Sequence, residues 1–139
     1  MKLQKNTLLA LYSVLEFAAD PSRHVAAAVI ADKYGVSQHH LAKVLSELAR
    51  AGLVESVRGV GGGYRFAGNA KRLTLMDVIR LFEEPLQSPS PAGATAQATP
   101  VDRALDAVLA EIEKMALVTF SSIPLATLLR MVHTHAGRP

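Results

Sequence analysis

The first third of the chain places apolar residues at a helical period. Over residues 6–19 they recur every three or four positions, which predicts an amphipathic helix that Asp20-Pro21-Ser22 ends. The apolar face of this helix carries Leu8, Leu11, Tyr12, Leu15 and Ala18. A second helix is predicted over residues 25–34. It is apolar nearly all round, so we expect it to be buried.

A third helix is predicted to begin after Ser37, whose side chain suits the N-cap position. Gly52 supplies a left-handed stop just beyond its end. Its inner face carries Leu41, Val44, Leu45 and Leu48. Because only Gly35-Val36-Ser37 separates the second and third helices, the two together predict a helix-turn-helix.

Two short β-prone segments follow, "LVESV" and "YRFA". They are separated by the stretch from Arg58 to Gly63, which contains four glycines. The pattern predicts a β-hairpin with a long, glycine-rich tip.

The pattern changes sharply after residue 83. Before it, a fourth helix is predicted over residues 75–83, with Thr74 as its cap and with Met76, Ile79 and Phe82 facing inward. After it, residues 84–100 are rich in proline and small polar residues and have almost no large apolar side chain. This composition indicates a linker or loop.

A long helix is predicted to begin at residue 100. Thr99 suits the cap, Pro100 the first helical position, and Asp102 the positive end of the helix dipole. Apolar residues then recur in steps of four and three, as in a seam between two helices, and we expect the partner to be a second copy of the chain. The seam consists of Val101, Leu105, Val108, Ile112 and Met115. A closing helix over residues 124–132 is expected to pack against the long one.

Charge is unevenly distributed along the chain, whose net charge is +3. Residues 37–72 contain six basic residues against two acidic ones, a local balance of +4 around the glycine loop. From residue 84 onward, four basic residues face five acidic ones, a balance of −1. A polyanionic partner therefore suits the first half of the chain.

The composition excludes several kinds of chemistry. The chain has no cysteine, so it can form no disulfide, no thiolate metal site and no thiol nucleophile. His39 and His40 are adjacent and point about 100° apart on a helix, so they are no chelating pair. No serine, carboxylate and histidine set has a catalytic spacing, and the longest apolar run, Val25 to Ala31, is too short to span a membrane. We expect a cytoplasmic protein without a cofactor, a metal or catalytic residues.

The stretch "RGVGGGYRFA" at residues 58–67 allows three interpretations. A Walker loop or a dinucleotide fingerprint opens into a helix that faces the phosphates, whereas this one leads into the strand-like "YRFA". A nucleotide-binding enzyme therefore lacks its geometry. Because glycine has no Cβ, the backbone can also approach a DNA phosphate closely, as a wing does. The third interpretation is a loose turn without a function.

The segment "VSQHHLAKVLSELARAGLVESVRGVGGGYRFAG" at residues 36–68 resembles the signature of the Rrf-two family of bacterial transcription regulators, which includes IscR, NsrR and the cysteine-metabolism repressor. The turn serine followed by "HL", then "L..AGLV" and "RG.GGGY", carry this resemblance. It covers residues 1–83 well and the terminal helices in layout only. It implies a mainly α fold with a small β-hairpin: a winged helix-turn-helix domain plus a long helix that pairs two copies.

Several members of the family carry an iron-sulfur cluster held by three cysteines in the loop before the long helix, and some use an acidic residue in the first helix. This chain has no cysteine in that loop, and Leu8 stands at the position of the acidic residue. The resemblance therefore implies a DNA-binding protein that lacks the iron-sulfur cluster with which those members sense their signal.

The candidate DNA contacts lie in two places. In a helix-turn-helix, the first turn of the second helix meets base edges, which makes Gln38, His39, His40 and Lys43 candidates beside the cap residue Ser37. Glutamine can read adenine, whereas Lys43 suits a phosphate. Arg58 suits a phosphate or the minor groove. The remaining wing candidates are Gly59, Gly61, Gly62, Gly63, Tyr64 and Arg65.

These observations predict a winged helix-turn-helix domain over residues 1–83, a loop over 84–100, and dimerisation and closing helices over 101–139. The expected function is that of a homodimeric repressor that binds specific sites on double-stranded DNA. Three options remain for its regulation: a small molecule bound beside the last helices, a partner protein, or no effector. The alternative is a protein-interaction module in which the winged helix or the 84–100 loop docks a partner protein.

Overall fold

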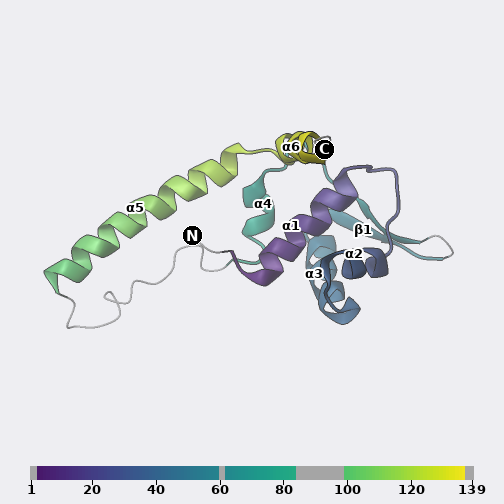
Figure 1. Ribbon diagram of the computed structural model, residues 1–139, viewed down its shortest axis with the longest axis horizontal. Helices are drawn as coiled ribbons and strands as arrows, with labels where there is room; N and C mark the ends of the chain where they lie inside the picture. The colour runs from purple at the N-terminus through teal and green to yellow at the C-terminus, as the bar shows by residue number, and fades with distance from the viewer. Residues whose placement is uncertain (1–2, 60–61, 84–98, 137–139) are drawn as a thin grey trace.

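The computed structural model describes residues 3–59, 62–83 and 99–136. The elements in chain order are α1 (Lys5–Ala18), α2 (Ala27–Tyr34), α3 (Gln38–Arg50), β1 (Val54–Val57), β2 (Gly63–Phe66), α4 (Leu75–Ile79), α5 (Pro100–Ser122) and α6 (Leu125–Ala136). The first four helices and the hairpin gather into one body, from which α5 projects (Figure 1). The predicted mainly α fold with a small β-hairpin is confirmed.

Helix α1 lies at the centre of the core, where it contacts α3, α4, α6 and β2. Phe17 is fully buried, but Leu8 and Tyr12 are 36% and 40% exposed. The predicted apolar face therefore coincides only in part with the buried one. The buried face is rotated relative to the predicted one, so that Leu9 and Val14 are also buried. The helical period alone did not identify which of the apolar residues meet the rest of the core.

Helix α2 is shorter and less buried than predicted. It begins two residues late because Val25 pairs with Tyr64 of β2 in an isolated β-bridge. Ile30 and Ala31 are buried, whereas Val29 is 55% exposed. The expectation of a helix buried all round was wrong, because one face of α2 packs on the core and the other meets solvent.

Helix α3 agrees with its prediction. The Ser37 hydroxyl accepts a hydrogen bond from the backbone N–H of His40 at 3.0 Å. Gly52, just beyond the helix, has a φ of 81°, the left-handed conformation that favours glycine. The inner residues Leu41, Val44, Leu45 and Leu48 are all buried. They hold the helix on the core and leave its opposite face to solvent.

Strands β1 and β2 pair antiparallel, with Val54 opposite Phe66 and Val57 opposite Gly63. Val54 and Phe66 are buried, which anchors the base of the hairpin in the core. The predicted hairpin is confirmed, and its strands extend away from the body (Figure 1).

Helix α4 ends four residues earlier than predicted. Its start is as expected, because Thr74 and Asp77 form a capping box in which the Thr74 N–H donates to Asp77 Oδ2 at 2.8 Å. After Ile79 the backbone tightens into turns, with the Leu81 N–H donating to the Val78 carbonyl. Phe82 is half-buried at the edge of the core.

Helix α5 begins as predicted, with Pro100 in its first turn. The Asp102 N–H donates to the Thr99 hydroxyl at 3.1 Å, and the Thr99 N–H donates back to Asp102 Oδ2 at 3.0 Å. This backbone hydrogen bond, followed by one from the Thr99 hydroxyl, holds the pKa of Asp102 below its usual value. None of the 23 residues of α5, all of them described, is buried. Leu117 and Phe120, near the end of the helix, are half-buried against the core.

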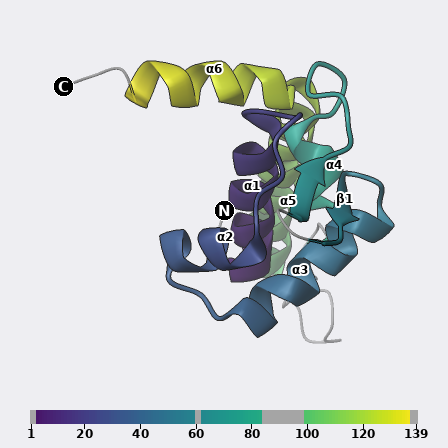
Figure 2. The same ribbon diagram turned by 90° about the vertical axis from the view of Figure 1, so that its right-hand side faces the viewer.

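Helix α6 packs on α1 instead of lying along α5 as predicted (Figure 2). Leu125 is fully buried. The N–H groups of Leu125 and Ala126 donate to the carbonyls of Leu73 and Ala70, both at 2.8 Å. These bonds hold the start of α6 on the segment between β2 and α4. No helix within the described ranges is long and apolar enough to cross a membrane.

Candidate nucleic-acid interface

The outer face of α3 is polar and exposed. Because the apolar inner face is buried, the opposite residues turn to solvent, and these are Gln38, His39, Ala42, Lys43 and Ser46. The predicted base-contact residues Gln38, His39 and Lys43 all lie on this face. Sequence reasoning missed Ala42 and Ser46. Continuing the helical period from the first turn along the polar face would have found them.

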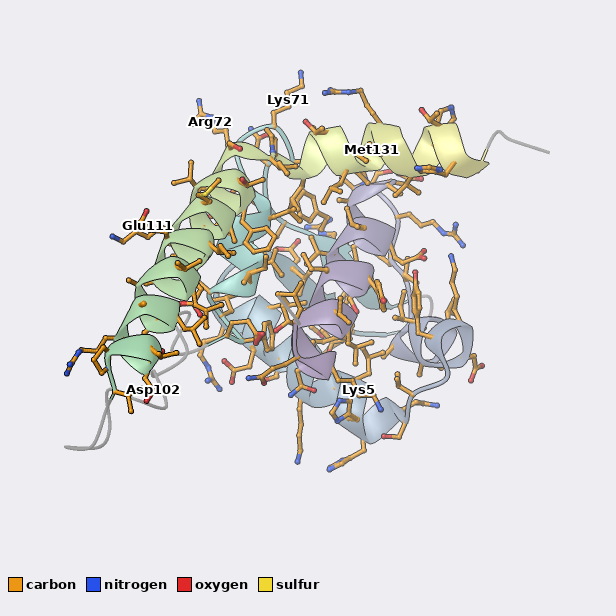
Figure 3. The ribbon with its side chains drawn as sticks, turned by 60° about the vertical axis from the view of Figure 1, so that its left-hand side comes forward. Lys5, Lys71, Arg72, Asp102, Glu111 and Met131 are labelled. Atoms are coloured by element: carbon orange, nitrogen blue, oxygen red, sulfur yellow. The ribbon has the colours of Figure 1, made fainter. Side chains whose placement is uncertain are left out.

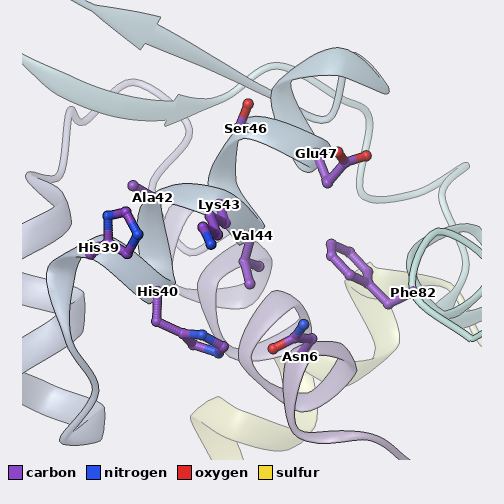
Figure 4. A pocket seen from close by; sticks show the side chains of 9 residues that line it. All are labelled: Asn6, His39, His40, Ala42, Lys43, Val44, Ser46, Glu47 and Phe82. Atoms are coloured by element: carbon purple, nitrogen blue, oxygen red, sulfur yellow. The ribbon is translucent and has the colours of Figure 1, made fainter.

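His40 differs from the other predicted contacts on α3. Its ring reaches toward Asn6 at the start of α1, beside a shallow hollow of about 490 Å³ that Lys43 and Phe82 also line (Figure 4). Its Nε2 atom is buried and has no hydrogen-bond partner among the described residues. His40 thus lies on the flank of α3, half-buried, while His39 is exposed.

The wing tip is a tight turn at its described positions. The Gly62 N–H donates to the Gly59 carbonyl at 2.9 Å. Gly59 has a φ of 103°, and a Cβ on Gly62 would lie 2.3 Å from the Val57 carbonyl oxygen. Arg58 is exposed beside this turn. The structure therefore gives these two glycines a definite backbone role, whereas Gly61 lies outside the described residues.

The two residues after Gly63 are already engaged within the protein. Tyr64 is half-buried, and its ring stacks on that of Phe17 with the centroids 6.2 Å apart. Arg65 forms an ion pair with Glu55, its partner across the hairpin. Arg58 has no such ion pair among the described residues. Of the two wing arginines, Arg58 is thus the one left free for a phosphate or a groove.

The local excess of positive charge is not all on one surface. Lys71 and Arg72 lie beside the junction of α5 and α6, while Lys5 lies at the far end of α1 (Figure 3). Lys71 and Arg72 belong to the turn that holds the start of α6, and both are exposed. The sequence argument placed them around the glycine loop, and this part of it was wrong. The positive charge near α3 and the wing comes instead from Lys43 and Arg58, because Arg50 forms an ion pair with Glu47 on the same helix.

The predicted seam on α5 is exposed along its whole length. Its residues are Val101, Leu105, Val108, Ile112 and Met115, between 54% and 68% exposed. Leu109 and Val118 are also exposed, at 55% and 70%, and sequence reasoning did not include them. The apolar surface of α5 is therefore wider than the seam predicted from the sequence. No other described part of the protomer covers it.

A groove of about 680 Å³ lies between α1, α2 and α6. Its apolar lining includes Leu15, Leu129 and Val132, and Lys33 and Arg130 supply positive charge. The groove lies against α6, one of the two terminal helices beside which an effector is expected to bind.

Glu16 ties α1 to α2 at the edge of this groove. It accepts hydrogen bonds from Lys33 Nζ and from the Tyr34 hydroxyl, each at 2.5 Å. Burial alone would raise the pKa of Glu16, but these hydrogen bonds outweigh it and lower the pKa. Burial and the hydrogen bond to Glu16 raise the pKa of Tyr34. Tyr12 completes the contact by stacking on Tyr34, with the ring centroids 4.8 Å apart.

A cysteine-held iron-sulfur cluster does not fit this chain, which has no cysteine to supply the thiolates. Among the residues that the structure describes, no three histidine, aspartate or glutamate side chains gather into a metal site either. The 84–98 segment lies outside the described residues.

Comparison with known proteins assigns the family. The sequence profile of the Rrf2 family, described as an iron-dependent transcriptional regulator, matches residues 3–131. The chain is 50% identical to a protein of Rhodopseudomonas palustris described as the HTH-type transcriptional regulator BadM, over 96% of this chain and 85% of that protein.

Solved structures agree. CymR, the global cysteine regulator of B. subtilis, superposes with a TM-score of 0.75 at 27% identity, over 94% of this chain and 98% of that one. IscR of T. potens superposes with a TM-score of 0.72 at 25% identity, over 100% of this chain and 93% of that one. The resemblance first noted in residues 36–68 thus extends over nearly the whole chain. The protein belongs to the Rrf2 family of winged-helix transcription regulators.

Proposed function

We propose that this protein is a homodimeric repressor that binds specific sites on double-stranded DNA in the cytoplasm, without a cysteine-ligated iron-sulfur cluster and without enzymatic activity. The observation that carries the proposal is the exposed polar face of α3 next to a wing whose Arg58 has no ion pair among the described residues. Family membership and the likeness to CymR and IscR support it.

The two parts of the surface have different tasks in this proposal. Gln38 and His39 lie in the first turn of α3, where a recognition helix meets base edges, and Gln38 has the two hydrogen-bonding groups that pair with adenine. Lys43, one turn further on, contacts phosphate. Arg58 reaches a phosphate or the minor groove beside the site that α3 reads.

The exposed face of α5 supports a dimer. Monomeric proteins rarely leave a long contiguous apolar surface in water, and a second copy related by two-fold symmetry would cover it. Pairing through Leu105, Val108 and Ile112 then places two recognition helices on one duplex. In such dimers the half-sites lie about 34 Å apart, one turn of DNA, so we expect a near-palindromic site.

Fluorescence anisotropy with a duplex selected from a random library tests the proposal. The affinity should fall steeply with salt, with a log-log slope of about −0.9 for each phosphate neutralised. A slope near zero, or equal affinity for selected and scrambled duplexes, contradicts sequence-specific binding to DNA.

The Arg58→Ala variant distinguishes this proposal from the alternative, a protein-interaction module. If the variant binds DNA as the wild type does but loses a protein partner that the wild type captures, the wing serves the partner. An effector also stays a prediction. Thermal unfolding of the wild type and of Val132→Glu, compared across a set of metabolites, tests the groove between α1, α2 and α6. An effector that acts there stabilises the wild type and not the variant.

A further inference from the structure

The hairpin is joined to the segment just before α2 as well as to its own strands. The Val25 N–H donates to the Tyr64 carbonyl, and the Tyr64 N–H donates to the Val25 carbonyl, both at 2.8 Å. Such a reciprocal pair is a complete antiparallel bridge. The strand that leads back from the wing tip is thus held at the entrance to the helix-turn-helix.

Gly63 is required for this approach. A Cβ built on Gly63 would lie 2.5 Å from the Val25 carbonyl oxygen and 2.9 Å from the Ala26 nitrogen. Both neighbours are backbone atoms, so no rotamer change can make room for a side chain. Any other residue at this position would push the hairpin and the 25–26 segment apart.

Tyr64 adds a side-chain contact to the bridge. Its ring stacks on Phe17, which is fully buried in α1, with an interplanar angle of 29°. The Ala67 N–H donates to the Leu53 carbonyl at 2.9 Å and closes the base of the hairpin. The hairpin is therefore fixed at its base and at Tyr64, while Arg58 stands beyond both attachments.

We infer that Val25, Gly63 and Tyr64 act as a wing clamp that determines specificity, by fixing the position of Arg58 relative to the reading face of α3. The inference rests on the proposed function. Val25 leads directly into α2, and α2 contacts α3. The clamp therefore fixes the position of the wing relative to α3. A duplex presents a major-groove site and the adjoining minor groove at a fixed spacing. A protein whose α3 and wing are held rigidly therefore binds only sites with the matching spacing. A protein whose wing is loosened also binds sites with a different spacing.

The test uses the full chain and a duplex selected from a random library. Interference footprinting first identifies the bases that α3 contacts and those that the wing contacts. One base pair is then inserted between them. The wild type should lose at least about tenfold in affinity, the scale of a mismatched base pair. Gly63→Ala should bind the selected site more weakly and lose less than about threefold on the insertion, since its wing can adjust.

Ser56→Ala is the matched control, because Ser56 is exposed and lies opposite Tyr64 in the same hairpin. It should discriminate against the insertion as the wild type does. Amide hydrogen exchange without DNA provides a second measurement. In Gly63→Ala the amides of Val25 and Tyr64 should exchange faster, while the amide of Leu45 in α3 keeps its protection.

If Gly63→Ala does not fold, Tyr64→Ala replaces it, since it removes the ring contact and leaves the backbone bridge. It should also lose discrimination, and Tyr64→Phe should restore it, which identifies Tyr64 as a positioning residue. A folded Gly63→Ala or Tyr64→Ala that discriminates like the wild type overturns the clamp. If the wild type itself selects no duplex, the proposed function fails instead, a result distinct from unchanged discrimination in the variants.

Discussion

Arg65 and Glu55 face each other across the hairpin and form an ion pair, whereas Arg58, at the end of the same hairpin, is exposed without one among the described residues. Arg58→Ala should therefore weaken binding to all duplexes alike and reduce the salt slope by about 1, because one phosphate contact is lost. Arg65→Ala should change both quantities less. Anisotropy titrations over a series of KCl concentrations measure the two effects, and equal losses from both variants contradict this difference between the arginines.

Gln38→Ala should act on particular bases. The side chain lies in the first turn of α3 and is exposed, so its loss should cost about 1 to 3 kcal/mol at the bases it reads and relax the choice there. Selection from a duplex library that is randomised at each position measures the change. Thr134→Ala, exposed on α6 and outside the proposed interface, is a suitable control. A uniform loss across all sequences would show that Gln38 contacts the backbone of the DNA instead.

Leu105→Asp combined with Ile112→Asp should yield monomers. Both side chains are more than half exposed in the protomer, and burying two charges in an apolar seam is unfavourable. Light scattering measures the mass. The matched control is Ala107→Asp with Ala110→Asp, on the other side of the same helix, which introduces the same charges and should leave the dimer intact. If the seam variant stays dimeric, the interface lies elsewhere.

The Glu16 contact should make stability depend on pH at both ends of the range. The pKa of Glu16 is lower in the folded state than its usual value of 4.5, so its contribution is present above that value and is lost as the pH falls. The pKa of Tyr34 is raised from 10.0, so its contribution is present below pH 10 and is lost as the pH rises above it. Glu16 is partly exposed, so we expect Glu16→Gln to lower the free energy of unfolding at pH 7 by only about 1 kcal/mol.

Urea unfolding at several pH values checks this prediction. The difference between the wild type and Glu16→Gln should shrink below about pH 4.5, where the unfolded carboxyl is protonated. Tyr34→Phe should flatten the decline of the wild type above about pH 10. A difference that stays constant from pH 3 to pH 7 would mean that the carboxylate charge of Glu16 does not contribute.

The boundaries set by local chemistry could be predicted from the sequence. Ser37, Gly52 and Thr99 mark helix ends because caps and left-handed glycines act within a few residues of the chain. The start of α4 could be predicted by the same rule. The end of α4 could not, because the backbone after Ile79 turns against the core and no residue type there marks the end of the helix.

Tertiary contacts could not be predicted in the same way. Val25 has the apolar character of a helix residue, yet it pairs with Tyr64, which is far away in the sequence. Lys71 and Arg72 follow the wing closely in sequence, but the chain carries them to the junction of α5 and α6. At the candidate site, the exposed face of α3 followed from its period, whereas the ion pair of Arg65 depends on the hairpin register.

The turn that leads from α5 into α6 is attached to the strand-to-helix connection behind the wing. The Leu75 N–H donates to the Ile123 carbonyl at 3.0 Å, and the Leu125 N–H donates to the Leu73 carbonyl. A change in the tilt of α5, caused by binding at its projecting end, would therefore displace residues 73–75. Those residues lead from β2 into α4, so a helix about 35 Å long is joined by backbone hydrogen bonds to the segment that follows the wing.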